Sequence, residues 1–162
     1  MITNQMEITF KALSVNEGFA RSCVAAFCVQ LNPTLDELTD IKTAVSEAVT
    51  NSVVHAYPKK MGDVTIQVFL MDNKRVKINV IDNGIGIKNF EKAMQPFYTS
   101  KPNDERSGMG FTVMQTFMDN LTLSKNENGG LIVTMEKEFG KVSLARMSNT
   151  SAWSWNNNEP CN

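Results

Sequence analysis

Hydrophobic and polar residues alternate in several stretches of the chain, with the period expected of half-buried strands. In the first stretch, Ile8, Phe10 and Ala12 share one side. Short turns at Asp72-Asn73 and at 127–130 separate later stretches and predict two antiparallel hairpins. The predicted strands cover residues 6–12, 64–70, 76–80, 121–124 and 131–137.

Apolar residues at helical spacing predict three helices, over residues 17–31, 35–56 and 111–119. We expect Asn16 to be the N-cap of the first helix. Its apolar stripe comprises Phe19, Cys23, Phe27 and Leu31. The second helix opens with the capping box Thr34-x-x-Glu37. Its buried side comprises Leu38, Ile41, Val45, Ala48 and Ser52.

The predicted element order is β-α-α-β-β-loop-α-β-β, with residues 83–110 mostly loop. Strands joined by short turns pair in antiparallel fashion, and the helices then gather on one face. We therefore expect an α+β fold, a two-layer sandwich with helices on one face of an antiparallel-rich mixed sheet. One domain over residues 1–140 accounts for the pattern, and residues 141–162, rich in Ser and Asn, are expected to form a disordered tail.

Composition narrows the possible functions. The 162 residues suffice for one domain with a substantial core. A formal net charge of −1, with 20% charged residues, gives no electrostatic basis for binding nucleic acid or an anionic membrane. No apolar run reaches transmembrane length, and the N-terminus lacks the order of a signal peptide. Cys23, Cys28 and Cys161 lack metal-ligand spacing, and we interpret Cys23 and Cys28, which lie in an apolar helix pattern, as reduced core thiols of a cytoplasmic protein.

Polar residues interrupt the apolar pattern of the second helix. In SEAVTNSVVHAY, residues 46–57, Glu47, Asn51 and His55 recur every fourth residue and share one face. Glu47 and Asn51 are about 6 Å apart along the axis. An amide oxygen there suits a hard cation that already carries water and phosphate, and a glutamate can act as a base. The alternative is a solvent-facing stripe, and we interpret His55 as an ordinary helix-end histidine.

A second pattern follows the third predicted strand. Asp82 stands at the end of the strand, and Gly84 and Gly86 follow it closely. Glycines allow a ligand ring to approach the backbone, and an aspartate there can accept a hydrogen bond from an exocyclic amine. The alternative is an ordinary Asp-Asn-Gly turn, although no alternating strand follows as it would in a hairpin.

A third pattern, RSGMGF at residues 106–111, leads directly into the last predicted helix. Glycines at a helix start leave backbone N–H groups free to face an anion, and the helix dipole favours negative charge there. Lys101 and Arg106 add two cations to the same loop. These features indicate a phosphate site, but no Gly-Lys-Ser/Thr closes the loop as in a Walker A motif. A flexible glycine connector is the alternative.

Together the three patterns supply a cation site, an acceptor for an amine and a basic glycine-rich loop, as Mg²⁺, adenine and phosphates require. Over roughly residues 5–140 the chain resembles the GHKL ATPases and kinases. Glu47-x-x-x-Asn51 is similar to the N box of that family, Asp82-x-Gly84-x-Gly86 to its G1 box and Gly108-x-Gly110 to its G2 box. The resemblance implies the GHKL, or Bergerat, ATP-binding fold.

The resemblance is closest to one branch of this superfamily. At this length we expect none of the further domains of gyrase, Hsp90 or mismatch-repair proteins. The single histidine, His55, lies in the N box, which disfavours a sensor histidine kinase. The chain is most similar to the free-standing anti-sigma serine kinases, above all to the sporulation factors of the sigma-F type. The similar stretches are FAR at 19–21, LDELTDIKTAVSEAVTN at 35–51, FYTSKP at 97–102 and ERSGMGF at 105–111.

The resemblance implies a role for each matching residue. Asn51 would hold Mg²⁺, and Glu47 would be the catalytic base that orients or deprotonates a substrate serine. Asp82 would accept the adenine amino group, while Gly84 and Gly86 would leave room for the nucleotide. The lid over the phosphates would comprise Thr99, Lys101, Arg106, Ser107, Gly108, Met109 and Gly110.

The implied function is that of an ATP-dependent anti-sigma factor. It would inhibit a sporulation sigma factor and phosphorylate the anti-anti-sigma protein on serine, with ATP/ADP and Mg²⁺ as cofactors. Arg21, exposed on the first helix, would contact both proteins, and a cytoplasmic homodimer is expected. Two alternatives are a general-stress-type anti-sigma serine kinase and a nucleotide-gated sigma-binding module without kinase activity.

One residue departs from the family pattern. Gly130 is followed by Leu131, where the family usually has a threonine whose hydroxyl helps around the adenine. Either a water bridge to the base is lost, or Thr134 or another group replaces it.

Overall fold

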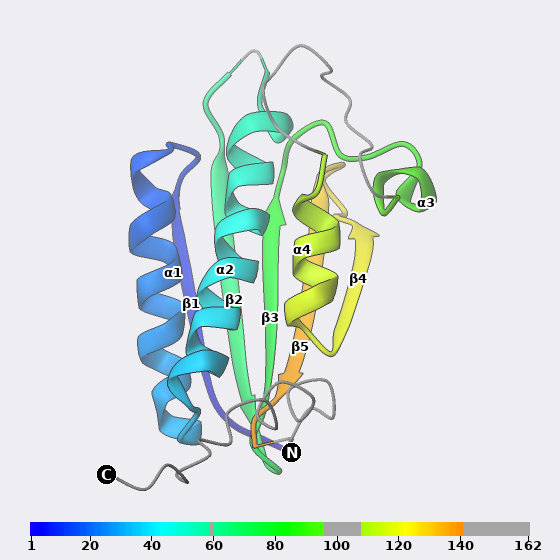
Figure 1. The fold of residues 1–162 in the computed structure, drawn as a ribbon. Coiled ribbons are helices and arrows are strands. Elements are labelled where there is room, and N and C mark those ends of the chain that lie inside the picture. The colour runs from blue at the N-terminus through cyan, green and yellow to red at the C-terminus, as the bar shows by residue number, and fades with distance from the viewer. Residues whose placement is uncertain (59, 96–107, 141–162) are drawn as a thin grey trace, which may run out of the picture.

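The computed structural model describes residues 1–58, 60–95 and 108–140. The strands are β1 (Ile2–Lys11), β2 (Asp63–Met71), β3 (Arg75–Asp82), β4 (Asn120–Lys125) and β5 (Leu131–Glu138). The α-helices are α1 (Val15–Cys28), α2 (Leu35–Asn51), α3 (Phe90–Ala93) and α4 (Gly110–Phe117), and a 3₁₀ turn (Val29–Leu31) and a π-helix (Ser52–Ala56) follow α1 and α2. Helices α1, α2 and α4 lie side by side on one face of a single sheet (Figure 1).

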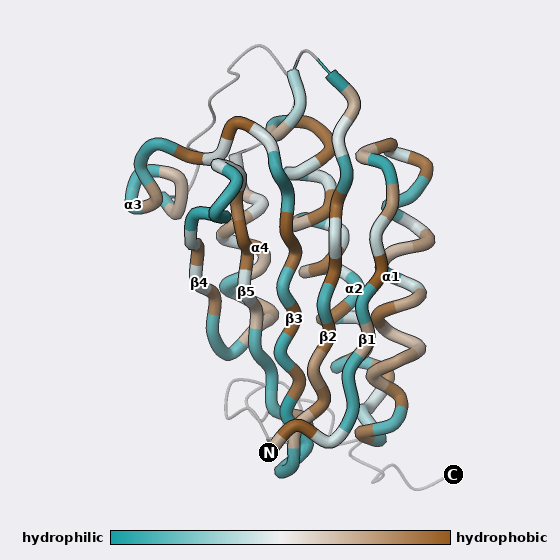
Figure 2. The backbone as a smooth tube through the Cα atoms, turned by 180° about the vertical axis from the view of Figure 1, so that it is seen from behind, coloured by the Kyte–Doolittle hydropathy of each residue, from teal (hydrophilic) through white to brown (hydrophobic). Residues whose placement is uncertain are grey.

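The sheet has the strand order β1-β2-β3-β5-β4, and its four pairings are all antiparallel. Both hairpins expected from the sequence, β2–β3 and β4–β5, are present. Strand β5 inserts between β3 and β4, so that Ile81 lies opposite Ile132. Seen from behind, the strands show alternating apolar and polar positions (Figure 2). The α+β sandwich with an antiparallel-rich sheet is therefore confirmed.

The core lies between the sheet and the helices. Its fully buried residues include Val64, Ile66 and Val68 of β2, Val76 and Ile78 of β3, and Ile41, Val45 and Val49 of α2. At one edge of the core, Lys137 of β5 pairs with Asp40 of α2 at 3.2 Å and donates to the carbonyl of Phe117 at 2.7 Å. This cation therefore orients α2 and α4 against β5.

Two expectations for the first helix are wrong. Ser14, rather than Asn16, is the N-cap, because Asn16 turns back and donates its side-chain N–H to the carbonyl of Lys11 at 2.9 Å. The expected stripe with Phe19 is not the buried one, since Phe19 is 57% exposed. Small and medium-sized residues face the core instead, because α1 packs against both α2 and the sheet. The buried residues of α1 are Ala20, Val24, Ala25 and Cys28.

The second helix follows the expectation at its start and departs from it at its end. The capping box is complete, with the Glu37 N–H donating to Thr34 Oγ1 at 3.2 Å and the Thr34 N–H donating to Glu37 Oε2 at 2.8 Å. The expected α-helix to residue 56 instead ends at Asn51, and its last five residues form a π-helix. Such wider turns are often found at functional sites.

The remaining expectations concern smaller features. A short helix, α3, interrupts the segment expected to be mostly loop. Cys23 and Cys28 are free thiols, as expected, and burial raises the pKa of Cys28 to about 12. Cys161 and the rest of the expected tail lie outside the described residues. Among the helices described, none combines the length and apolar character needed to cross a bilayer.

The Glu37 carboxylate links the start of α2 to the end of β5. Its Oε1 accepts the backbone N–H of Gly140 at 2.7 Å. Burial acts to raise the pKa of Glu37, but the N–H groups of Thr34 and Gly140, the Thr34 hydroxyl and the Lys137 charge outweigh burial and lower the pKa. A carboxylate with a lowered pKa stabilises the fold above its unfolded-state pKa and loses that contribution as the pH falls.

We predict that Glu37→Gln lowers the free energy of unfolding at pH 7 by about 1–2 kcal/mol, because the amide cannot satisfy the same donors. The difference from wild type should shrink as the pH falls through the folded-state pKa, where the wild-type side chain is also neutral. Urea denaturation between pH 3.5 and pH 7.5 measures it, with Glu127→Gln in the exposed β4–β5 turn as the control. A constant difference across that range would contradict the assignment.

Candidate nucleotide-binding site

Glu47 and Asn51 meet the start of α4. Both are half-buried near the C-terminal end of α2. Gly110, the first residue of α4, packs against them: a methyl group on its Cα would lie 3.1 Å from Glu47 Oε2 and 3.3 Å from Asn51 Nδ2. The N-terminal end of α4, which carries partial positive charge, therefore adjoins a carboxylate and an amide. In Figure 1, α2 and β3 end, and α4 begins, at the same edge of the molecule.

Asp82 ends β3 with a buried carboxylate that accepts three hydrogen bonds. Its Oδ1 accepts the backbone N–H of Gly84 at 3.0 Å and that of Leu131 at 3.2 Å. Its Oδ2 accepts the Ser52 hydroxyl at 3.2 Å. Burial raises the pKa of Asp82, and these three donors act against the rise. An ionised carboxylate has four acceptor positions, so one position on Oδ2 is left for a further donor.

The G1 glycines are required by close contacts of the backbone. A methyl group on Gly84 would lie 2.2 Å from the carbonyl oxygen of Ala56, and the same carbonyl accepts the N–H of Ile85 at 3.0 Å. Gly86 has a φ of +64°, which a residue with a side chain rarely adopts. The loop after β3 thus docks directly on the π-helix that ends α2, which places the G1 box beside the N box.

Leu131 contributes its backbone to the site and its side chain to the core. The backbone N–H of this residue holds Asp82, while its side chain is buried in the core. Thr134 is not available for the base, because it lies on the opposite face of β5 and its hydroxyl donates to Asn79 Oδ1 at 3.0 Å. Of the possibilities left open by the sequence, the orientation of Thr134 disfavours its hydroxyl as the replacement, while a lost water bridge and another group remain.

Three residues that support the site were not recognised from the sequence. The Asn126 amide donates to the carbonyl of Asp82 at 3.0 Å and to Asn83 Oδ1 at 2.6 Å, which ties the β4–β5 turn to the end of β3. The Tyr57 hydroxyl accepts the N–H of Asn83 at 2.8 Å. Ser52 was expected only as part of the buried side of α2. A sequence gives no signal for such contacts, because each partner is distant along the chain.

The expected lid lies only partly within the described residues. Thr99, Lys101, Arg106 and Ser107 fall outside them. Gly108 has a φ of +64°, and Met109 is the N-cap residue of α4. The described end of the lid therefore leads into α4 at the position where Gly110 contacts Glu47 and Asn51.

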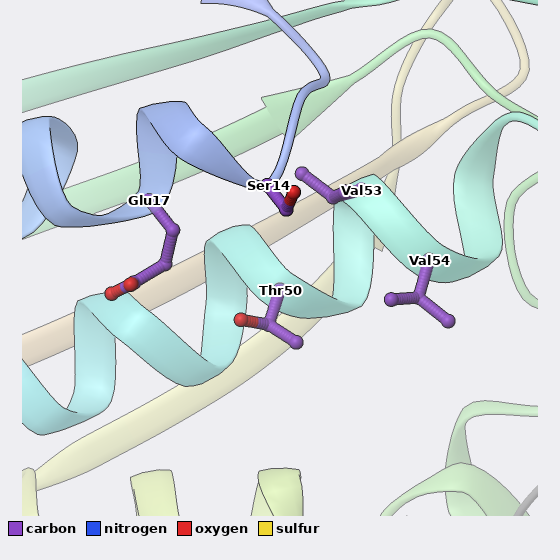
Figure 3. A pocket seen from close by; sticks show the side chains of 5 residues that line it. All are labelled: Ser14, Glu17, Thr50, Val53 and Val54. Atoms are coloured by element: carbon purple, nitrogen blue, oxygen red, sulfur yellow. The ribbon is translucent and has the colours of Figure 1, made fainter. Parts of the chain in front are cut away.

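Arg21 lies away from this site, on the exposed side of α1. Its guanidinium is 3.4 Å from Glu17 Oε1 and donates to Ser46 Oγ at 3.4 Å, and Ser46 in turn donates to Glu17. Glu17 also lines a small hollow of about 170 Å³ between the start of α1 and the end of α2 (Figure 3). The hollow is lined by Ser14, Glu17, Thr50, Val53 and Val54, none of which belongs to the three boxes. The hollow is therefore separate from the residues expected to bind nucleotide.

Helices cover one face of the sheet, a carboxylate and an amide lie at the start of α4, and a buried aspartate precedes two glycines. This combination is that of a nucleotide-binding domain of the histidine kinase type. The family described as "Histidine kinase-like ATPase domain" matches residues 10–137. The chain belongs to this family, and its domain is one that binds nucleotide.

Relatives that match over nearly their whole length show to which group within this family the chain belongs. Proteins named "Anti-sigma F factor" are 57% identical over 143 residues in Clostridium kluyveri, covering 88% of this chain and 100% of that protein. The relative of the same name in Caldanaerobacter subterraneus is 55% identical over 138 residues, covering 85% of this chain and 96% of the relative. The chain therefore belongs to the anti-sigma F factor family.

A solved structure supports the fold independently. The RsbU and RsbW domains of Rv1364c from Mycobacterium tuberculosis superpose with a TM-score of 0.60 at 18% identity, covering 85% of this chain and 32% of that longer one. At this identity the likeness concerns the fold alone.

We predict that Asp82→Asn weakens nucleotide binding and makes the stability of the variant relative to wild type increase with pH. Because burial raises the pKa of Asp82, the ionised carboxylate destabilises the folded state increasingly as the pH rises from its unfolded-state pKa to its folded-state pKa. The unfolding free energy of the variant relative to wild type should therefore rise over this interval and then level off. ATP affinity should fall by more than about tenfold, since a charged acceptor is lost.

Urea denaturation from pH 3.5 to 7.5 and calorimetric ATP titration measure the two effects. Asp72→Asn, which alters an exposed carboxylate paired with the N-terminus, serves as the control and should not reproduce the trend. A relative stability that falls with rising pH would contradict the raised pKa.

Proposed function

We propose that the protein is an ATP-dependent anti-sigma factor and a protein serine kinase. It binds and inhibits a sporulation sigma factor and phosphorylates the anti-anti-sigma antagonist of that factor on serine. The observation that carries this proposal is the contact of Glu47 and Asn51 with Gly110 at the start of α4, because it joins a base, a metal ligand and a phosphate-binding helix end in one place. The relatives named "Anti-sigma F factor" support the regulatory half of the proposal.

The donor groups fit a nucleotide with Mg²⁺. The amide oxygen of Asn51 is a neutral hard ligand, and water and phosphate oxygens complete the shell that Mg²⁺ usually keeps. The described residues contain no group of three or more His, Cys, Asp and Glu side chains that could hold a metal by themselves. When bound, the ion neutralises charge on the phosphates.

Glu47 is the proposed catalytic base. Its carboxylate adjoins the first turn of α4, where the N–H groups attract the phosphates. It would orient the serine hydroxyl of the substrate and accept its proton as the hydroxyl oxygen attacks the γ-phosphorus, whose bond to the β–γ bridging oxygen breaks to release ADP. Phosphoryl transfer depends mainly on such positioning and on neutralising charge.

The lid completes the site over the phosphates. Thr99, Lys101, Arg106 and Ser107 are proposed to close over them together with Gly108, Met109 and Gly110. The left-handed backbone of Gly108 and the N-cap position of Met109 support a sharp entry from the lid into α4. Two cations in the lid would oppose the charge of the triphosphate.

Arg21 is the proposed contact for both protein partners. Its side chain is 47% exposed but anchored by Glu17 and Ser46, so its head group is held in place at the surface. Phe19 and Val15 lie on the same helix and are also exposed. Arginine is enriched at the centres of protein interfaces, and Phe19 and Val15 project from other sides of the helix.

Assembly and location complete the proposal. We expect a homodimer in the cytoplasm, on the basis of the resemblance, and light scattering of the purified protein measures the oligomeric state.

Two other functions compete with this proposal: a general-stress-type anti-sigma kinase and a nucleotide-gated sigma-binding module without kinase activity. Only a kinase transfers label from γ-labelled ATP to the anti-anti-sigma protein.

We predict that Glu47→Ala keeps ATP affinity within about threefold but lowers phosphoryl transfer by at least about 100-fold, because it removes only the base. Asn51→Ala should lose Mg²⁺-dependent nucleotide binding as well. Labelled ATP, the anti-anti-sigma protein and calorimetry with and without Mg²⁺ separate the two effects, and Glu127→Ala controls for loss of a carboxylate. Unchanged transfer by Glu47→Ala would remove Glu47 from the catalytic role.

We predict that Arg21→Glu weakens sigma-factor binding by at least about tenfold and leaves ATP affinity unchanged, because charge reversal affects the surface of α1 and not the nucleotide site. Lys125→Glu on the exposed edge strand β4 is the control for net charge. Surface-immobilised sigma factor measures binding in the presence of ATP. Capture at the wild-type level would show that the partner binds elsewhere.

A further inference from the structure

Ser52 carries a buried hydroxyl between α2 and the aspartate of the G1 box. The residue is 2% exposed and begins the π-helix. Its Oγ lies 3.2 Å from Asp82 Oδ2 and 3.4 Å from the carbonyl oxygen of Ala48. These two acceptors compete for a single hydroxyl proton.

The geometry indicates that the Ser52 hydroxyl donates its hydrogen bond to Asp82. The Ala48 carbonyl already accepts the backbone N–H of Ser52, which it shares with the carbonyl of Val49. The carboxylate is the nearer acceptor and carries charge, and hydrogen bonds to charged groups are the stronger ones. The hydroxyl therefore donates to Oδ2.

Three donors from three segments then hold the carboxylate. Gly84 belongs to the loop after β3, Leu131 to the start of β5, and Ser52 to the end of α2. The two backbone N–H groups occupy both acceptor positions of Oδ1, and Ser52 occupies one position of Oδ2. A single acceptor position remains, on Oδ2. Rotation of the carboxylate about its Cβ–Cγ bond would break all three hydrogen bonds.

We propose that Ser52 is a positioning residue for base selection, which locks the Asp82 carboxylate so that its one open acceptor receives the amino group of a 6-aminopurine. This inference rests on the proposed nucleotide role of Asp82. A 6-oxopurine would place an acceptor oxygen against the same lone pair and is rejected. A purine without a substituent at position 6 makes no such contact, and its affinity does not depend on Ser52.

The test compares Ser52→Ala with wild type for three nucleotides: ATP, inosine triphosphate and purine riboside triphosphate, which has hydrogen at position 6. Calorimetry with Mg²⁺ measures each affinity. Ser52→Ala should weaken ATP binding by about five- to tenfold, less than the loss of a direct hydrogen bond to a charged group, because Ser52 acts through Asp82. The affinity for purine riboside triphosphate should stay within about twofold, so the preference for ATP over both analogues falls.

Two further variants control for structural effects. Ser22→Ala removes a hydroxyl that donates to the Gly18 carbonyl at 2.7 Å on the exposed side of α1, and it should leave all three affinities unchanged. Ser52→Thr keeps the hydroxyl and should restore the wild-type preference for ATP. If Ser52→Ala does not fold, Ser52→Cys takes its place, since a thiol has similar size but is a weak donor.

The outcomes are distinct. The assignment of Ser52 is overturned if Ser52→Ala, or Ser52→Cys in its place, loses affinity equally for all three nucleotides. It is also overturned if that variant keeps the wild-type preference for ATP. If Asp82→Ala binds ATP as tightly as wild type does, the proposed role of Asp82 is overturned, and this inference with it. Loss of ATP preference with Ser52→Ala, and its recovery with Ser52→Thr, supports it.

Discussion

The burial of the Asp82 carboxylate is the constraint on which the site depends. An ionised carboxylate loses its hydration on burial, at a cost of several kcal/mol unless donors replace the water. The donors here come from the end of α2, the loop after β3 and the start of β5. Satisfying this one group therefore joins three segments that are far apart in the chain, at the edge of the sheet where the nucleotide is proposed to lie.

The rest of the fold holds these segments in register. Strand β5 pairs with β3, which brings Leu131 to the end of the strand that carries Asp82. The contact of Lys137 with Asp40 and the Phe117 carbonyl orients α4 against α2 at its far end. With that end held, the first turn of α4 lies against Glu47 and Asn51. A packed sheet and helix layer thus supports both the end of the site proposed to recognise the base and the end proposed to bind the phosphates.

Local patterns predicted local structure well. The capping box at Thr34 and Glu37 acts over three residues, and both of its hydrogen bonds are present. The Asp72-Asn73 turn produced the expected hairpin because turn chemistry is also local. The prediction of Asn16 as the N-cap was wrong, since its side chain donates to the carbonyl of Lys11 instead. The stripe with Phe19 failed because amphipathic spacing cannot tell which of two adjacent faces will meet a neighbouring helix.

The sequence by itself determined the elements, the α+β class and the three groups of residues with the chemistry of a nucleotide site, because propensity, periodicity and glycine spacing act over a few residues. Only the tertiary structure decided that Gly110 adjoins Glu47 and Asn51, that the backbone N–H of Leu131 donates to Asp82, and that the Thr134 hydroxyl faces Asn79 on the other side of the sheet. It also decided that the Ser52 hydroxyl donates to the Asp82 carboxylate. These contacts depend on strand order and helix packing, in which the partners are brought together from distant positions along the chain.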